Sequence, residues 1–370
     1  MLSLREKLRA SMPEAAKPKK KANDDCFIRE RRLPARGLLD AEILDSETLY
    51  RITGEMQEPC SREEILFLDT ETTGLSGGAG TLAFEVGTGW FCGDEFIIRQ
   101  YVMRDYNEEG PMLQHILQDM EGKTVFCTFN GKTFDVPLLT SRMIMNRLRI
   151  REARQLDLLH IARRVWKLRL GRCNLTRLEE AVLGRERDDD LPGAQVPERF
   201  FNYLKTGDFS LFEDVLDHNF QDVASLSEIL NHLIGAHNAP GEHLKEAEDA
   251  FSMGNIMLKR GRFALSRECY HLADQGKLSA PAHERLALSY KKESRWQEAA
   301  DVYRQMIKAG QGRLLPYVEL AKIYEHRLNE PERALKVTEA AIRGAQARDE
   351  EWLPALEKRY LRLIKKTRRT

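Results

Sequence analysis

Two acidic side chains stand where an apolar run ends. In the stretch FLDTETTGLSGGAGT, residues 67–81, Asp69 and Glu71 follow large apolar residues and precede a group of glycines. Side chains two positions apart on a β-strand point to the same side, so these two carboxylates lie close together. Neighbouring anions lose hydration and repel each other unless a cation lies between them. Mg²⁺ prefers such hard oxygen ligands, and the pattern therefore indicates a divalent metal site.

Two further acids occur in similar places. Asp135 ends the stretch FCTFNGKTFD, just past a second apolar run, and Asp222 lies within the helical pattern LFEDVLDHNFQDVASLSEIL. Acids on two strand ends and a helix could converge on one edge of a sheet. We therefore expect Asp69, Glu71, Asp135 and Asp222 to form one metal-binding cluster.

Other polar groups are weaker candidates for chemistry. The stretch GLSGGAG lacks the Lys-Ser/Thr pair of a phosphate-binding P-loop, which favours a flexible turn that admits a nucleic-acid strand. Asp157 either caps its helix or has an auxiliary role in the site. His160 is expected at the surface or in packing, and the three aspartates at 188–190 are expected in a solvated loop.

Hydrophobic periodicity predicts the elements that must position these acids. Apolar runs predict strands at 64–72, 81–91, 95–103 and 124–129, the second and third joined as a hairpin. Helical spacing predicts helices at 110–120, 136–148, 157–168, 174–183, 197–205 and 210–234. Strands that form a meander and then alternate with helices predict an α/β layered domain over residues 62–236. The stretch GAHNAPGEH, residues 235–243, is expected to be a linker.

This set of acids resembles the DEDD exonuclease superfamily, whose domain has the ribonuclease-H-like fold. The first motif of that superfamily is D-x-E within an apolar strand, followed by T-G. It is present here as Asp69, Glu71, Thr73 and Gly74. The resemblance implies a mixed sheet flanked by helices, with the acids at one edge.

The second and third motifs of the superfamily also have counterparts. Asn130, Phe134 and Asp135 match the second motif, in which Phe-Asp follows an asparagine. His218 and Asp222 would be the third, which pairs a Tyr or His with an Asp on the last helix. The histidine branch uses H-x4-D, whereas this chain has H-x3-D, the spacing of the tyrosine branch. Residues at i and i+4 share a helix face, so both side chains can reach one site.

The resemblance implies a metal-dependent 3′–5′ exonuclease with two Mg²⁺ or Mn²⁺ ions and a nucleic-acid substrate, either DNA or RNA. Asp69, Glu71 and Asp222 would hold one ion, and Asp69 would anchor the second. Asp135 would complete the cage of charge through water, while His218 would orient or deprotonate the nucleophile. The residues expected at the substrate are Thr72, Thr73, Gly74, Leu75, Asn130 and Phe134.

The C-terminal part of the chain is helical and periodic. Gly254, Ala287 and Ala321 recur at spacings of 33 and 34, and a large side chain follows each of them three positions later. Such a period, with small residues where two helices cross, resembles tetratricopeptide repeats; an unrelated helical bundle is the alternative. The chain also resembles the YprB-type ribonuclease-H-like proteins, which join a nuclease domain to such repeats. The resemblance implies a protein partner for the repeats.

Four segments are expected along the chain. They are a basic flexible segment and lead-in (1–61), a ribonuclease-H-like domain (62–236), helical repeats (244–345) and a basic helix or tail (346–370). Arginines and lysines also concentrate at 142–172, either as an anion-binding face or as a solvated helix surface.

Bulk composition adds little about partners. The 58 basic side chains balance 58 acidic ones, so net charge favours no class of ligand. Six scattered cysteines without a C-x-x-C pair fit a reducing compartment. No run of about 18 apolar residues occurs, so we expect a cytoplasmic protein with no membrane contact.

A rival hypothesis is a non-catalytic scaffold that grips nucleic acid with the nuclease fold and recruits a protein through the repeats. The four acids argue against it, because uncompensated carboxylates weaken the binding of a polyanion.

Overall fold

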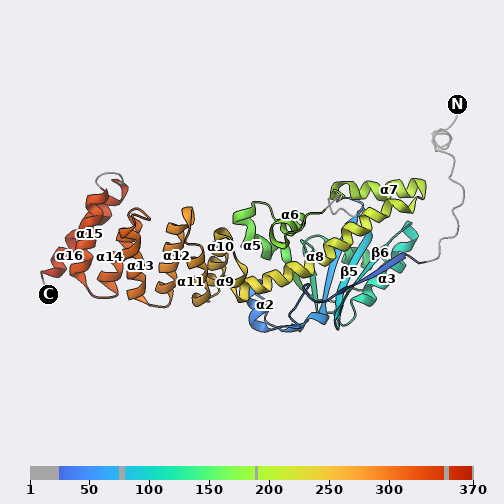
Figure 1. Cartoon of the computed structure of the whole chain (residues 1–370), viewed down its shortest axis with the longest axis horizontal. Helices are drawn as coiled ribbons and strands as arrows, with labels where there is room; N and C mark the ends of the chain where they lie inside the picture. Colours follow the sequence, from blue (N-terminus) through green and yellow to red (C-terminus); the bar gives the residue numbers. More distant parts are fainter. Residues whose placement is uncertain (1–24, 75–79, 188–190, 346–349, 369–370) are drawn as a thin grey trace, which may run out of the picture.

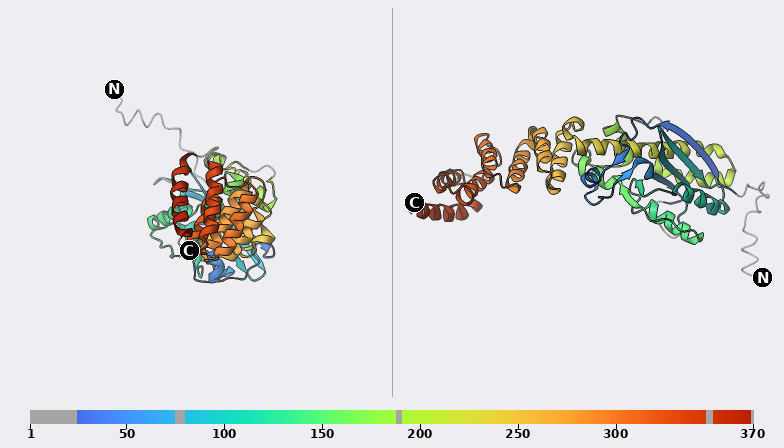
Figure 2. Two further views of the ribbon diagram at one scale, coloured as in Figure 1. Left: turned by 90° about the vertical axis from the view of Figure 1, so that its left-hand side faces the viewer. Right: turned by 90° about the horizontal axis from the view of Figure 1, so that it is seen from below.

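The computed structural model describes residues 25–74, 80–187, 191–345 and 350–368. A mixed β-sheet flanked by helices comes first, and an all-helical array follows it along the long axis of the molecule (Figure 1). The view from below shows the same elongated arrangement, with the helical array leading away from one end of the sheet (Figure 2). This architecture confirms the predicted α/β fold with a helical C-terminal region.

The main sheet has six strands in the order β1-β6-β5-β4-β7-β8. Strands β4, β7 and β8 are parallel to one another, so their carboxyl ends share one edge of the sheet. Strands β5, β6 and β1 continue the sheet as antiparallel neighbours, and β5 and β6 form the predicted hairpin. The strand bounds are β1 Phe27–Pro34, β4 Ile65–Thr72, β5 Ala83–Cys92, β6 Glu95–Val102, β7 Val125–Thr128 and β8 Arg154–Asp157. A separate two-stranded sheet pairs β2 (Ile43–Leu44) with β3 (Cys60–Ser61).

Alternation along β4 divides the core into two layers. Leu66 and Leu68 face a cluster built with α3 (Glu109–Asp119), α4 (Asp135–Met145) and α7 (Val196–Thr206). Phe67 faces the opposite cluster, built with α2 (Ser46–Thr53), α5 (Leu158–Leu170) and α8 (Glu213–Asn238). The odd-numbered residues Asp69 and Glu71 therefore project toward α8.

The N-terminal region holds an element that the sequence did not indicate. Residues 27–34, expected to be part of a lead-in, form β1, and the strand pairs with β6 along its full length. In its sequence, FIRERRLP, the half-buried residues are Phe27, Arg29, Arg31 and Leu33, and the residues between them are exposed. Such a charged strand suits a sheet edge, where a polar surface discourages pairing with another chain. The short strand β8 was also unexpected.

The expected linker is helical. Helix α8 crosses the sheet and continues to Asn238, and the short helix α9 (Pro240–His243) follows it directly (Figure 1). The chain therefore passes from the sheet to the helical array without an extended segment. The array consists of α10 Ala247–Lys259, α11 Phe263–Leu272, α12 Ser279–Lys292, α13 Trp296–Lys308, α14 Leu315–His326, α15 Pro331–Ala345 and α16 Leu353–Thr367.

Small residues lie where neighbouring helices of the array cross. Gly254, Ala287 and Ala321 are buried. A Cβ atom on Gly254 would lie 2.6 Å from Tyr270 Cε1, so the contact between α10 and α11 requires glycine. At the far end, α16 packs on α15, and Arg362 donates two hydrogen bonds to the buried Glu325. Among the described residues, no helix has the length and apolar character needed to cross a membrane.

Candidate functional site

The first acids of the site lie on β4 and α8. Asp69 and Glu71 project from the carboxyl end of β4 toward α8, which carries His218 and Asp222 one turn apart. His218 Nε2 is 3.7 Å from Glu71 Oε1 and 3.6 Å from Asp222 Oδ2. The strand has a β-bulge between Glu71 and Thr72, a feature common next to active sites. The structure thus brings these acids together with His218.

Asp135 reaches the same edge of the sheet from α4. Its carboxylate accepts a hydrogen bond from the hydroxyl of Thr70, whose side chain points to the opposite face of β4 from Asp69. Asp135 is buried at the first residue of α4, where the helix dipole favours a negative charge. It therefore adds charge to the cluster without a direct hydrogen bond to the other acids among the contacts described.

Burial and mutual repulsion raise the pKa of the clustered acids. The pKa of Asp69 lies well above its ordinary range because of burial and the charges of Asp222, Glu71 and Asp135. Burial also raises the pKa of Asp222, although His218 and Arg187 oppose the shift. Acids held this way favour a cation, and their hard oxygen atoms fit Mg²⁺ or Mn²⁺. The donor set therefore fits the divalent ions that the resemblance implies.

The titration of Asp135 predicts a pH-dependent stability. Burial raises the pKa of Asp135 from 3.8 to about 6. Its contribution to the free energy of unfolding is therefore fully present below pH 3.8 and is lost as the pH rises through 6. In EDTA-containing buffer, we expect the wild type to lose up to about 3 kcal/mol more unfolding free energy between pH 4 and 7 than Asp135→Asn loses. Urea denaturation across this range measures the difference. Parallel pH profiles for the two proteins would contradict it.

Arg187 is a site residue that the sequence did not reveal. Its side chain is only 5% exposed and lies 2.6 Å from Glu179 Oε1 in an ion pair. The same guanidinium pairs with Asp222, and Glu179 also accepts a hydrogen bond from the Ser225 hydroxyl. Arg187 thus ties the last acid of the cluster to the π-helical turn Glu179–Leu183. Nothing in the local sequence RERDDD distinguishes it from a solvated arginine, and residues 188–190 lie outside the described ranges.

The contact between Arg187 and His218 restricts the imidazole. Arg187 Nη1 lies 3.3 Å from His218 Nδ1, and a guanidinium can only donate. In the neutral ring Nδ1 must therefore accept, and the proton resides on Nε2, which faces Glu71 and Asp222. This arrangement suits a side chain that orients two carboxylates. It leaves Nε2 unable to take a proton from water while Arg187 keeps its place.

A fifth carboxylate lies beside the cluster. Glu85 on β5 is directly opposite Glu71 in the ladder and is fully buried. Burial and the charge of Asp69 raise its pKa well above its ordinary range, while a hydrogen bond from Gln100 opposes the shift. Its only signal in the sequence is that it is the single charged residue in the apolar run 81–91.

The residues expected at the substrate have structural contacts in the loops near the acids. Thr72 donates to the carbonyl of Gly74 at 2.9 Å, and the Thr73 hydroxyl accepts from the backbone of Leu82 at 3.1 Å. Asn130 has a left-handed backbone with φ 70°, and Phe134 directly precedes α4. Leu75 and most of the glycine-rich turn lie outside the described residues. Contact of these residues with substrate stays a prediction.

Asp157 has the capping role that was one of its two alternatives. Its carboxylate accepts from the backbone N–H groups of Leu159, Asn130 and Lys132. It therefore begins α5 and at the same time holds the loop that leads to Asp135. His160 is exposed, as expected.

Two arginines of the basic segment 142–172 are engaged in ion pairs. Arg142 is in an ion pair with Glu109 at 2.5 Å, and Arg169 is in an ion pair with Asp249 at 2.8 Å. The exposed arginines at 147, 149 and 151 follow the end of α4 that lies away from Asp135. An anion-binding role for the remaining basic residues of the segment stays a prediction.

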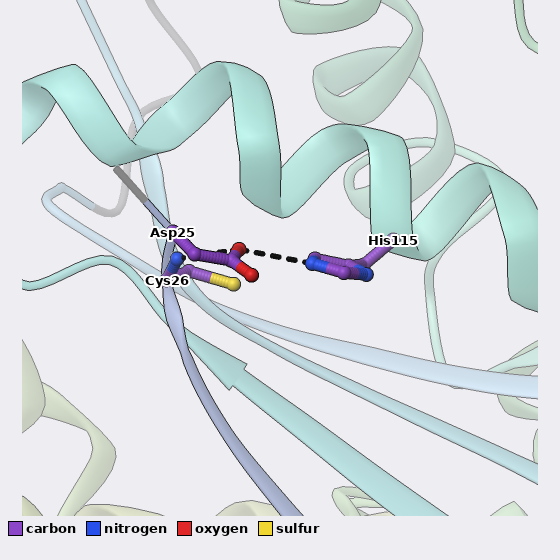
Figure 3. Close-up of side chains that lie close together, drawn as sticks. All are labelled: Asp25, Cys26 and His115. Carbon is purple, nitrogen blue, oxygen red and sulfur yellow. Dashed lines mark hydrogen bonds and ion pairs between the residues drawn. The ribbon is translucent and has the colours of Figure 1, made fainter. Parts of the chain in front are cut away.

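A separate cluster lies where β1 meets α3 (Figure 3). Asp25, Cys26 and His115 place a carboxylate oxygen, a thiol and an imidazole nitrogen within 4.8 Å of one another. His115 Nε2 is 2.9 Å from Asp25 Oδ1, and burial together with Asp25 raises the pKa of the Cys26 thiol to about 12. This hydrogen bond links the segment just before β1 to α3. This cluster is distinct from the acids on β4 and α8.

Comparison with known proteins agrees with the fold. Residues 66–234 match the family model described as the RNase_H superfamily. The chain is also 31% identical over 360 residues to the uncharacterized protein YprB of Bacillus subtilis (strain 168), an alignment that covers 92% of this chain and 86% of YprB. The chain therefore belongs to the family of YprB, with a ribonuclease-H-like domain that contains Asp69, Glu71, Asp135 and Asp222. This domain indicates nuclease-type activity on nucleic acid.

Proposed function

We propose that the chain is a DEDD-type nuclease that removes nucleotides from the 3′ end of a nucleic acid with the help of two Mg²⁺ or Mn²⁺ ions. The observation that carries this proposal is the clustering of Asp69 with Asp222, Glu71 and Asp135, with His218 Nε2 beside Glu71 and Asp222. Buried acids of raised pKa suit a centre built for cations and make a mere grip on a polyanion unfavourable.

The acids and Arg187 have different roles in the proposed reaction. Asp69, Glu71 and Asp222 would hold one ion, and Asp69 would hold the second. Divalent ions supply Lewis acidity that promotes attack by water and stabilises the leaving oxygen. Asp135 balances the charge of the centre from the α4 side, and Arg187 holds Asp222 in place through its ion pair.

His218 is proposed to orient carboxylates rather than to accept a proton. Its Nε2 faces Glu71 and Asp222, and Arg187 occupies the other nitrogen. We expect His218→Ala to lower turnover by about 10²-fold, because misplaced catalytic groups lose rate. His218→Gln keeps an N–H near the position of Nε2 and is expected to stay near the wild-type rate. Single-turnover rates measure both; equal losses of about 10²- to 10⁴-fold would instead identify a general base.

The helical array is proposed to be three tetratricopeptide-like repeats that bind a protein partner. The support is the period near 34 residues, the paired helices α10–α11, α12–α13 and α14–α15, and the close contact at Gly254. The closing helix α16 gives the array a charged end, as repeat arrays require for solubility.

The test of the proposed function compares linear and circular substrates. Purified protein with Mn²⁺ is offered 5′-end-labelled linear DNA and RNA, together with circular forms of both. We expect linear strands to shorten progressively from the 3′ end and circles to remain intact. Cleavage of circles would replace exonuclease with endonuclease action. Failure to cleave any of the substrates would favour the non-catalytic scaffold.

A further inference from the structure

A gap in the sheet lies next to Asp69. In the strand register, Asp69 on β4 is opposite Gly87 on β5, and Gly87 is opposite Gln100 on β6. Gly87 has no side chain, and α8 places Asn219 over it. A Cβ atom at position 87 would lie 2.1 Å from Asn219 Oδ1. The glycine therefore creates the space through which Asn219 reaches the sheet between Asp69 and Gln100.

A line of hydrogen bonds runs through this gap. Arg31 Nη2 donates to Gln100 Oε1 at 3.1 Å. Gln100 Nε2 donates to Asn219 Oδ1 at 3.2 Å, and Asn219 Nδ2 donates to Asp69 Oδ2 at 3.0 Å. Gln100 and Asn219 are 1% and 0% exposed, so water does not compete for these bonds.

Chemistry fixes the direction of both amides. Arg31 can only donate, so Gln100 must turn its oxygen toward it. The carbonyl of Leu216 and the carboxylate of Glu85 both accept from Gln100 Nε2, at 2.6 and 3.0 Å. Gln100 Nε2 has two hydrogen atoms for three acceptors, and its contact with Asn219 Oδ1 is the longest of the three. A donor at this position still requires Asn219 to face it with its oxygen, which leaves the N–H groups of Asn219 for Asp69. Turning over either amide would bring two donors face to face.

The outer end of the line is anchored to α8. Arg31 lies 2.9 Å from Asp217 in an ion pair, and its guanidinium stacks 3.6 Å from the ring centroid of Phe220. The residues flanking Asn219 on α8 thus hold the arginine that sets the orientation of Gln100. An edge strand and a central helix together determine which group Asp69 meets.

We propose that Arg31, Gln100 and Asn219 form a positioning relay that holds the Asp69 carboxylate for metal binding. The inference rests on the proposed function, because it assumes that Asp69 is a metal ligand. An N–H bond to Oδ2 fixes the rotation of the carboxylate and directs Oδ1 into the centre. Outer partners of metal ligands have this effect in other metalloproteins, and their loss costs about 10- to 100-fold in metal affinity.

The test measures Mn²⁺ binding by isothermal titration calorimetry, which needs no turnover. Gln100→Leu removes the middle of the relay, together with the hydrogen bond from Gln100 to Glu85, and leaves Asp69 in place. We expect it to weaken Mn²⁺ binding by about 10-fold or more. Tyr101→Phe is the matched control. It removes a buried hydrogen bond to Asp119, 2.6 Å long, from the next residue of β6 on the other face of the sheet. This variant is expected to bind Mn²⁺ as the wild type does.

A second variant keeps the proposal testable should Gln100→Leu fail to fold. Arg31 is partly exposed, so Arg31→Met is expected to fold and to weaken Mn²⁺ binding by a few-fold. Where both variants fold, adding Arg31→Met to Gln100→Leu should cause no further loss, because the relay is already broken.

The outcomes separate the two proposals. Wild-type Mn²⁺ affinity in Gln100→Leu, or in Arg31→Met where Gln100→Leu does not fold, would overturn the relay and leave the nuclease proposal standing. An equal loss in Tyr101→Phe would also overturn the relay. Absence of Mn²⁺ binding by the wild type would overturn the proposed function itself.

Discussion

Replacement of Asp69 by asparagine is expected to reduce hydrolysis by at least about 10³-fold, equivalent to about 4 kcal/mol of lost transition-state stabilisation, while the protein stays folded. Asp69 is the acid proposed to contact both ions, and an amide cannot replace its charge. The variant keeps an oxygen near Oδ2 for the Asn219 N–H. Because burial, Asp222, Glu71 and Asp135 raise the pKa of Asp69, its neutral replacement should also stabilise the metal-free protein at pH 7.

The experiment pairs Asp69→Asn with Asp119→Asn. Asp119 is also a buried aspartate, but its partners are Arg99, Thr88 and Tyr101, away from the clustered acids. We expect Asp119→Asn to retain activity and to lower the melting temperature. Asp69→Asn should instead lose activity and, in EDTA, have a higher melting temperature than the wild type. Hydrolysis by Asp69→Asn within a few-fold of the wild type would remove Asp69 from the catalytic centre.

Truncation after Asn238 is expected to lower the free energy of unfolding by at least about 4 kcal/mol relative to truncation after Ala273. Helix α10 packs directly on α5, and one apolar cluster continues from the sheet through Met253 and Met257 into the array. Polar contacts cross the same boundary, including a 2.9 Å hydrogen bond from Arg260 to the Ile52 carbonyl. Removal of even one large buried side chain costs about 2–5 kcal/mol, and the shorter fragment loses several.

Thermal and urea denaturation of the fragments 1–238 and 1–273 measure this difference. A loss of about 4 kcal/mol corresponds to roughly 10 °C in melting temperature for a domain of this size. The longer fragment retains α10 and α11 and is expected to melt near the temperature of the full chain. Equal stability of the two fragments would show that the sheet domain ends at α8 and that the array only adjoins it.

Sequence reasoning located the strand β4 and its acids because two signals coincide there. A continuous apolar run identifies a buried strand, and charged residues at the end of such a run need a physical explanation. The same reasoning predicted Asp135 after β7 and Asp222 on α8. The acids of β4 and Asp135 meet at one edge because β4 and β7 are parallel. The hydrophobic pattern predicts this pairing only at the level of the fold class.

The remaining features depend on contacts that are distant in sequence. Strand β1 lacks an apolar face and is recognisable only by its pairing with β6. Arg187 is indistinguishable in sequence from a surface arginine until its ion pairs with Glu179 and Asp222 are known. In the sequence, Gly87 only suggests a locally weakened strand. In the structure, its missing side chain leaves room for Asn219 of α8.

Helix α8 is a single helix that connects the clustered acids to the helical array. Sixteen residues separate Asp222 from Asn238, a distance of about 24 Å along one unbroken helix. At that length, a tilt of only about 2–3° moves one end by about 1 Å relative to the other. A 1 Å misplacement of a catalytic group can cost about 10²-fold in rate. A protein that binds the array and tilts α8 would therefore lower the rate of the proposed hydrolysis while remaining far from the substrate.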